Sequence, residues 1–119
     1  MSGIVFYRTE RHDAVVDFYV ETVGAERRLE QPDCTILRYD NQLFGFCDRE
    51  STDDCGILTF VYDTPAEVDA IHGTVRDELG NDRVEEPHEN GTYDIYQFFA
   101  EDPDGRTAEF QAFLGDVDL

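Results

Sequence analysis

Short apolar runs alternate with polar residues along most of this chain, and two stretches replace the alternation with helical spacing. The first begins at about Arg11. Its apolar positions are Val15, Phe18, Tyr19 and Val23, which recur at the spacing of one helix face. Gly24 follows as a C-terminal stop, so we predict a helix that ends there.

The second helical stretch starts with a clear signal. Thr64-Pro65-Ala66-Glu67 has the form of a capping box with proline at the first helical position. One apolar stripe then follows, formed by Val68, Ile71, Val75 and Leu79. Gly80 marks its end, and we predict a helix between these two signals.

Between and around the helices, alternating segments predict strands. These segments cover residues 4–8, 26–29, 34–39, 43–47, 57–62, 83–86, 93–100 and 107–113. Turn residues at Gln31-Pro32-Asp33 and Asp40-Asn41 separate the strands of the first half. The polar stretch 48–54 has no periodicity and is expected to be a linker.

The last two predicted strands form a hairpin around Asp102-Pro103-Asp104-Gly105, in which proline and glycine supply turn geometry. On the outgoing strand one face suits packing under a helix; it consists of Ala108, Phe110 and Ala112. The opposite face consists of Thr107, Glu109, Gln111 and Phe113. The single carboxylate on that face is the main candidate for function.

The predicted elements repeat in the order β-α-β-β-β, and Gly3-Ile4-Val5-Phe6 is echoed by Gly56-Ile57-Leu58-Thr59-Phe60. We predict one domain over residues 1–119, with a first module at about 1–48, a linker at 49–55 and a second module at about 56–115. The fold class is α+β. Two βαβββ modules would form a mixed sheet with helices on one face and a cup on the other.

Charge is the most unusual feature of the composition. The chain has 28 acidic residues and nine basic ones, all of them arginine, for a formal net charge of -19. The acids are scattered, so we attribute them to a salt-rich solvent, as in proteins of halophilic archaea; attraction of a cationic ligand is the alternative explanation. A surface without a basic patch disfavours nucleic-acid binding.

The cysteines and the apolar runs restrict the compartment. Cys34, Cys47 and Cys55 are an odd number without a Cys-x-x-Cys pair, so we expect reduced, partly buried thiols. No apolar run reaches the length that spans a membrane, and no signal-peptide pattern is present. We therefore expect a cytoplasmic protein without a membrane partner.

Two motifs resemble the vicinal oxygen chelate superfamily, which includes glyoxalase I, bleomycin-resistance proteins and extradiol dioxygenases. The first is Asp17-Phe18-Tyr19 with Gly24, and the second is Glu101-Asp102-Pro103-Asp104-Gly105 with Glu109-Phe110. The resemblance covers essentially the whole chain. It implies the paired βαβββ fold and a homodimer, in which modules of different chains may share a cup.

The resemblance also implies up to four metal-ligand positions, one on the first and one on the last strand of each module. Here they correspond to Ile4, Gly45, Ile57 and Glu109, of which only Glu109 offers a donor atom. Divalent ions need several converging donors, so we expect no metal and no other cofactor. His88 is the one histidine placed to assist Glu109, whereas His12 is expected on the far side from the cup and His72 in solvent.

A carboxylate among apolar neighbours is a candidate general base or ligand anchor, and no second catalytic group accompanies Glu109. We therefore expect metal-independent binding of a small molecule in an apolar cup rather than catalysis. The predicted ligand-binding residues are Phe6, Arg8, Arg38, Val61, Gln111 and Phe113. The alternatives are a divalent-metal lyase, isomerase or dioxygenase of the superfamily, and a dimeric structural or regulatory module without a ligand.

The charge balance makes a prediction about salt. In millimolar KCl the repulsion among the 28 acidic residues is weakly screened, whereas in molar KCl the screening length falls to about 3 Å. We expect the protein to lose structure when it is dialysed from molar to millimolar KCl, followed by far-UV circular dichroism. An unchanged spectrum would remove the halophile explanation.

Overall fold

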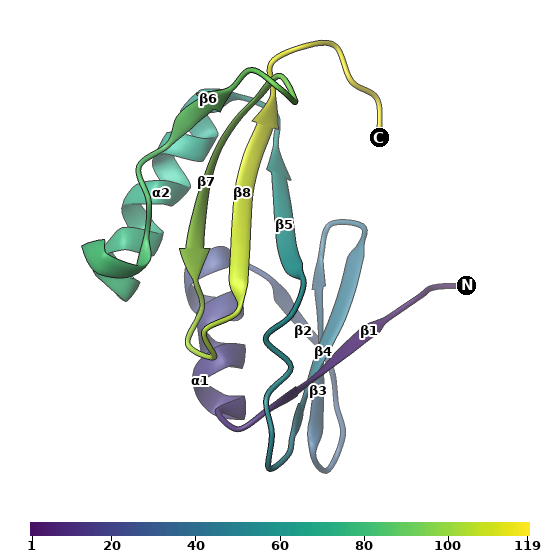
Figure 1. The fold of residues 1–119 in the computed structure, drawn as a ribbon. Helices are drawn as coiled ribbons and strands as arrows, with labels where there is room; N and C mark the ends of the chain where they lie inside the picture. Colours follow the sequence, from purple (N-terminus) through teal and green to yellow (C-terminus); the bar gives the residue numbers. More distant parts are fainter. The chain divides into compact units, whose positions relative to one another are not determined.

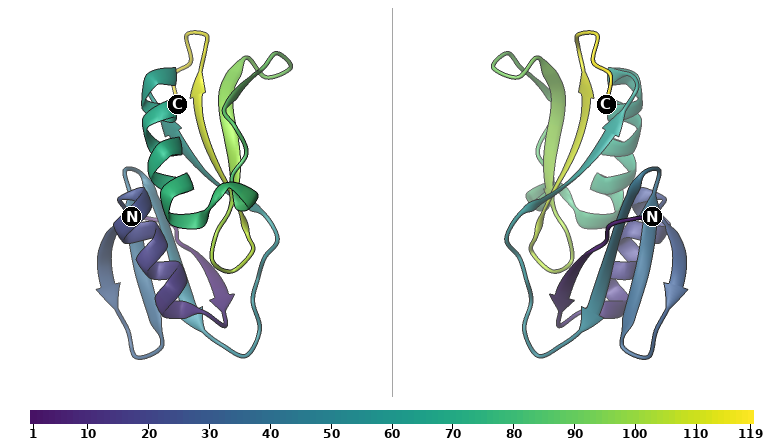
Figure 2. Two further views of the ribbon diagram at one scale, coloured as in Figure 1. Left: turned by 90° about the vertical axis from the view of Figure 1, so that its left-hand side faces the viewer. Right: turned by 90° about the vertical axis from the view of Figure 1, so that its right-hand side faces the viewer.

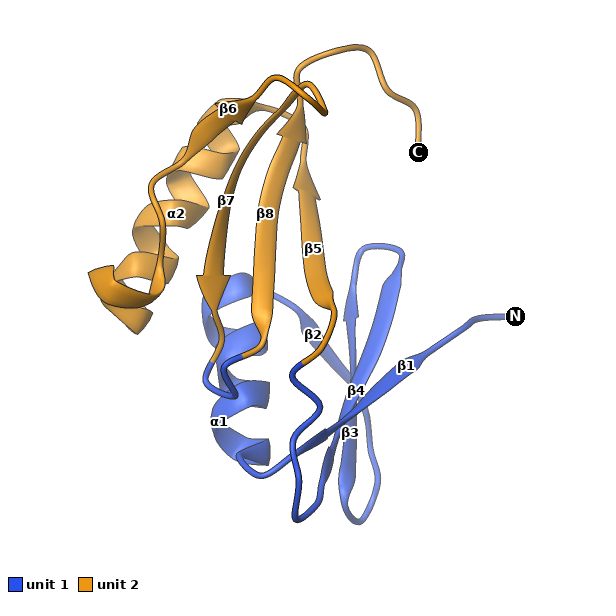
Figure 3. Ribbon diagram, in the orientation of Figure 1, with its two compact units in different colours: residues 1–54, 103–105 blue, residues 55–102, 106–119 orange.

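A computed structural model describes residues 1–119. The chain divides into two compact units (Figure 3). The first unit comprises residues 1–54 and 103–105, and the second comprises residues 55–102 and 106–119. Each unit contains a four-stranded mixed sheet and a helical segment, which confirms the predicted α+β fold of two βαβββ modules.

The first unit is a sheet with one helical layer (Figure 1). Its elements are β1 (Val5–Thr9), α1 (His12–Asp17), the π-helical turn η1 (Phe18–Val23), β2 (Glu26–Glu30), β3 (Cys34–Tyr39) and β4 (Gln42–Asp48). The strand order is β1-β4-β3-β2, and β1 runs parallel to β4. Tyr19 of η1 packs on Phe44 and Phe46 of β4, which places the core between helix and sheet.

The second unit repeats this arrangement, and Figure 2 shows α2 covering one face of its sheet. Its elements are β5 (Ile57–Tyr62), α2 (Pro65–Leu79), the 3-10 turn η2 (Asn81–Arg83), β6 (His88–Asn90), β7 (Ile95–Glu101) and β8 (Thr107–Phe113). The strand order is β5-β8-β7-β6, with β5 parallel to β8. Stacked rings of Phe60, Phe110 and Phe98 fill the layer under α2.

The ends of α2 follow the predicted signals. Thr64 Oγ1 accepts the Glu67 N–H at 3.2 Å, and Pro65 is the first helical residue. Gly80 ends the helix with φ +88°, a conformation that residues with a Cβ rarely adopt. The expectation that His72 faces solvent is wrong: it is buried, and its ring packs edge-on against Phe98.

Three strand predictions need correction. Ile4 precedes β1 instead of opening it. Residues 83–86 do not form a strand; η2 ends at Arg83, and Val84 makes only an isolated bridge to Ala100. Pro87 has no N–H to donate to a ladder, and β6 begins only at the next residue. The strand expected at 93–100 starts at Ile95, because Asp94 turns the chain with a positive φ of 55°.

The cysteine prediction is wrong for two of the three residues. Cys34 and Cys47 lie directly opposite each other on β3 and β4 and form a disulfide, while Cys55 is free and exposed. The Asp40-Asn41 turn pairs Tyr39 with Gln42, and counting outward along the hairpin brings the two cysteines face to face. No helix in the chain is long and apolar enough to cross a membrane.

A buried ion pair closes the β7–β8 turn. Arg106 and Asp102 both have fully buried side chains, with Arg106 Nη1 at 2.8 Å from Asp102 Oδ2. The Arg106 N–H donates to Asp102 Oδ1 at 3.0 Å, and the Asp102 N–H donates to the Arg106 carbonyl at 2.9 Å. Arg83 Nη2 donates to the Asp102 carbonyl at 2.6 Å, so the aspartate is held from both sides.

Removing one member of this pair should be costly. Arg106→Met would leave the Asp102 carboxylate buried without its guanidinium, and we expect the free energy of unfolding to fall by about 3–5 kcal/mol. Arg49→Met breaks an exposed pair with Asp33 and should change it little. Denaturant melts in molar KCl would measure both, and equal effects of the two substitutions would contradict the prediction.

Candidate functional site

The face of the second sheet that points away from α2, called here the open face, carries the predicted carboxylate. Glu109 of β8 lies opposite Thr59 of β5 on one side and Phe99 of β7 on the other. One step along the same face, Gln111 lies between Val61 and Gln97. The faces of β8 are therefore as predicted: Ala108, Phe110 and Ala112 are buried under α2.

Glu109 is only 9% exposed, and both of its carboxylate oxygens accept a hydrogen bond. Thr59 Oγ1 donates to Oε1 at 2.9 Å, and Gln97 Nε2 donates to Oε2. Gln97 Oε1 in turn accepts from Asn90 Nδ2 at 2.8 Å. Asn90 is itself fixed, because its Oδ1 accepts the Thr92 N–H at 3.1 Å. The carboxylate is thus oriented by a chain of neutral donors across all four strands of the sheet.

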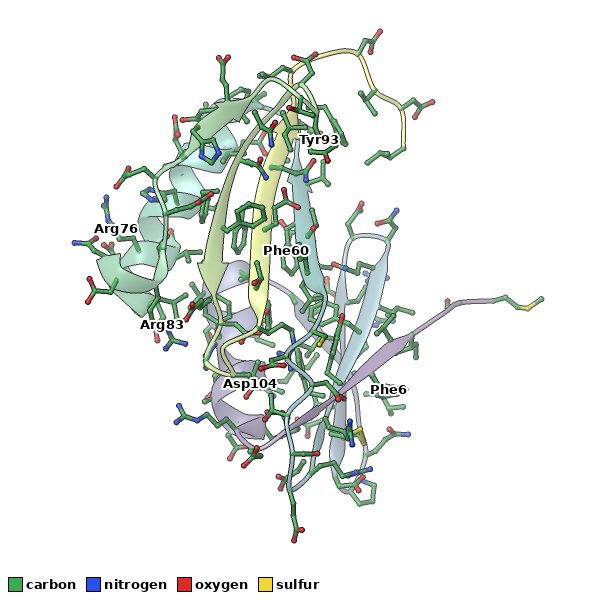
Figure 4. The ribbon with its side chains drawn as sticks, viewed as in Figure 1. Phe6, Phe60, Arg76, Arg83, Tyr93 and Asp104 are labelled. Carbon is green, nitrogen blue, oxygen red and sulfur yellow. A yellow bond between two sulfur atoms is a disulfide. The ribbon has the colours of Figure 1, made fainter.

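A hollow of about 400 Å³ lies beside this network. Its lining consists of Ile57, Asn90, Tyr93, Ile95, Gln97, Phe99, Glu109, Gln111 and Phe113. Tyr93, from the loop after β6, is mostly exposed and stands toward one end of the sheet (Figure 4). Five of the nine residues are apolar or aromatic, and Glu109 is the only one with a formal charge. An apolar recess with a few fixed polar groups is typical of small-molecule sites.

The remaining predicted ligand-binding residues divide between the units. The structure brings Val61, Gln111 and Phe113 onto the open face with Glu109. Phe6, Arg8 and Arg38 belong to the first unit. The side chains of Phe6 and Arg8 lie on the same face of β1. Gly45 pairs with both Phe6 and Ile36, so Ile36 and Arg38 lie on that face as well.

Both predicted arginines already have partners. The Arg8 guanidinium donates three hydrogen bonds to the Asp53 carboxylate, the shortest at 2.7 Å, and this carboxylate raises the pKa of Arg8. Arg38 Nη2 lies 3.4 Å from Glu26 Oε2.

The comparisons with known proteins identify the fold. No protein-family profile matches the sequence, and no curated protein matches it. Solved structures do match over nearly the whole chain. A glyoxalase/bleomycin resistance protein/dioxygenase family enzyme from Burkholderia phytofirmans PsJN superimposes with TM-score 0.79 at 20% identity, covering 93% of this chain and 97% of its own. The chain has the glyoxalase/bleomycin-resistance fold.

Two further matches have different functions. Lactoylglutathione lyase from Agrobacterium tumefaciens matches with TM-score 0.71 and 22% identity, covering 94% of this chain and 91% of its own. An antibiotic-binding protein from Streptomyces sp. CB03234 matches with TM-score 0.76 and 19% identity, covering 94% of each chain. The resemblance to the vicinal oxygen chelate superfamily is confirmed for the fold, and an enzyme and a binding protein share it.

The positions that the resemblance implies as metal ligands offer few donor atoms in this chain. Ile57 is apolar, and Ile4 lies outside β1. A Cβ at Gly45 would lie 2.6 Å from the ring of Phe6, so that ring occupies the space of any larger side chain there. The His88 ring lies 3.3 Å from the Glu86 carbonyl and is half exposed, without a contact to Glu109. No three His, Cys, Asp or Glu side chains converge on one point.

Sequence reasoning missed the three residues that orient Glu109. Thr59 was within reach of prediction, because pairing the parallel strands 57–62 and 107–113 from their first residues places it beside Glu109. Gln97 required the register of the final hairpin, which the four-residue turn sets. Asn90 lies in β6, whose three residues are all polar, so the pattern of apolar residues does not predict this strand.

The hydrogen bond between Gln97 and Glu109 can be tested by exchanging the two side chains. Gln97→Glu would turn a second carboxylate toward Glu109, with no donor between the two acceptors, so we expect a loss of about 1–3 kcal/mol in stability. Exchanging the pair, with Glu109→Gln added, restores a donor facing an acceptor and should recover most of the loss. Thermal melts of the three proteins test this, and a double variant no better than the single one would contradict the assigned network.

Proposed function

We propose that the protein binds a small molecule in the open-face hollow, without a metal ion, and that Glu109 is the polar anchor. The observation that carries this proposal is the fixed carboxylate in an otherwise uncharged, largely apolar lining. Burying a carboxylate is costly, and an apolar side chain would fill the same place without needing Thr59 and Gln97 to compensate it. Retaining the charge there is more easily explained by a ligand than by stability.

The free acceptor capacity of Glu109 supports binding of a donor. A carboxylate has about four lone-pair directions, and Thr59 and Gln97 use two of them. The remaining capacity suits an N–H or O–H group of a ligand whose apolar part contacts Phe99 and Phe113. Because the network fixes the carboxylate before a ligand arrives, little ordering entropy would be lost on binding.

The same geometry provides a general base but no second reacting group. The hollow contains no cysteine, serine or histidine that could act as a nucleophile or acid, and its other polar side chains are amides and the Tyr93 hydroxyl. The solved neighbour described as an antibiotic-binding protein is a precedent for ligand binding by a chain with this fold. Binding without chemical conversion is therefore the function we favour.

The proposal includes a homodimer. Apolar side chains on two edge strands are about half exposed in the single chain: Val5 and Phe6 on β1, and Ile57 and Val61 on β5. A second copy that covered them would remove apolar surface from water. The oligomeric state in molar KCl follows from light scattering coupled to gel filtration.

The first experiment combines metal analysis with a fragment screen. Protein purified without chelators or affinity tags is expected to contain no stoichiometric Mn²⁺, Ni²⁺ or Zn²⁺ and to show no rise in melting temperature when these ions are added. A library of neutral, cationic and anionic aromatic fragments is then screened by NMR. Binders should shift the side-chain amide resonances of Asn90, Gln97 and Gln111 and leave that of Asn41, in the β3–β4 turn, unchanged.

Each other result favours a different function. Stoichiometric metal that raises the melting temperature would support a metal-dependent lyase or isomerase; the lactoylglutathione lyase neighbour is the precedent for a lyase with this fold. Absence of any fragment that perturbs the three amides would support a structural or regulatory module without a ligand.

A further inference from the structure

A second hollow, of about 510 Å³, lies next to the first on the same unit. It is lined by Ile57, Asp82, Arg83, Val84, Glu85, Phe99, Ala100, Glu101 and Thr107. Ile57 and Phe99 line both hollows, so the two meet at these side chains. Tyr93 and Arg83 stand toward opposite ends of the sheet (Figure 4). We call the combined depression the trough.

The second hollow results from an early end of strand pairing. β6 pairs with β7 only as far as Gln97, so the following residues of β7 have β8 on one side and no strand on the other. Glu85 takes over at this edge: its N–H donates to the Phe99 carbonyl at 3.0 Å, and its Oε1 accepts the Phe99 N–H at 2.9 Å. The edge of β7 is thereby satisfied without a strand to cover it, and the hollow stays open.

The charges of the second hollow are predominantly negative. Three carboxylates, on Asp82, Glu85 and Glu101, face one guanidinium. That guanidinium, of Arg83, is already engaged, because it donates to the Asp102 carbonyl at 2.6 Å and lies 3.9 Å from Glu101. With Glu109 added, the whole trough is lined by four carboxylates and one arginine. An anionic ligand would be repelled from both halves.

The register fixes the spacing of the negative groups. Glu109 lies opposite Phe99, and Glu101 is two residues further along β7 on the same face. Two residues of a strand span about 7 Å, so Glu109 and Glu101 are diagonal neighbours, and Phe99 is adjacent to both on the same face. A flat apolar group seated on Phe99 would therefore reach Glu109 with a substituent directed across to β8 and Glu101 with a substituent directed along β7.

We propose that the trough binds an elongated organic cation with two ammonium groups, one at Glu109 and one at Glu101, joined by an apolar middle on Ile57 and Phe99. This inference rests on the proposed function and adds a second subsite to it. The ring face of Phe99 attracts positive charge as well as apolar surface. The pairing at Glu101 is exposed and the pairing at Glu109 is buried, so Glu109 supplies the anchor and Glu101 the selectivity for a second charge.

The test compares three probes of matched size: p-xylylenediamine, 4-methylbenzylamine and 4-methylbenzoate. Titration calorimetry is performed in the lowest KCl concentration that keeps the native circular dichroism spectrum. We expect the diamine to bind about tenfold more tightly than the monoamine and the benzoate not to bind. Glu101→Gln should reduce the affinity for the diamine to that for the monoamine and leave the monoamine within twofold.

A matched control removes one charge outside the trough. Glu89 of β6 lies opposite Tyr96, on the face that α2 covers, and Glu89→Gln should change neither affinity. Equal binding of the two amines, or equal effects of the two substitutions, would overturn the second subsite and leave the proposed function intact. If fragments other than amines shift the Asn90, Gln97 and Gln111 amides while both amines fail to bind, the cationic ligand is wrong and the binding function stands.

Discussion

The buried pair of Arg106 and Asp102 determines where the functional face of the second sheet lies. The pair closes the turn between β7 and β8 with hydrogen bonds in both directions, and the strands leave it in a fixed register. That register places Phe99 opposite Glu109 and Gln97 one step further on. A slip of one residue would turn Glu109 into the aromatic layer beneath α2. Register is therefore as important to the site as the identity of its residues.

The sequence predicted the elements whose signals are local. The capping box at Thr64, the glycine stop at Gly80 and the Asp102–Gly105 turn all encode their structure within four residues, and all three are confirmed. Features that depend on pairing between distant residues were harder to predict from the sequence. Cys34 and Cys47 meet only through the β3–β4 register, and His72 is buried because Phe98 lies beneath it. The hydrogen-bond network was the hardest part to predict, since Glu109 was singled out from the sequence but its partners Thr59, Gln97 and Asn90 were not.

The fold alone does not determine the function, so the side chains of the site have to be considered. A lyase and an antibiotic-binding protein superimpose on this chain at similar TM-scores. The side chains of this chain itself bear on the question: the Phe6 ring covers Gly45, Ile57 has no donor atom, and Glu109 accepts from two neutral partners. A carboxylate oriented by neutral donors has no cation of its own that competes with a cationic ligand.

The acidity of the whole chain and the acidity of the trough act at different ranges. Arg8, Arg27 and Arg49 are paired in exposed positions and do not line the trough, whereas Arg83 lines it and is engaged with the Asp102 carbonyl and Glu101. In molar salt the field of the scattered acids decays within about 3 Å, too short a range to steer a ligand. An ion pair inside a recess loses less of its interaction energy to salt screening, because few bulk ions enter the recess. Selection of a cation in such a solvent would therefore depend on Glu109 and its apolar surroundings and not on the net charge of -19.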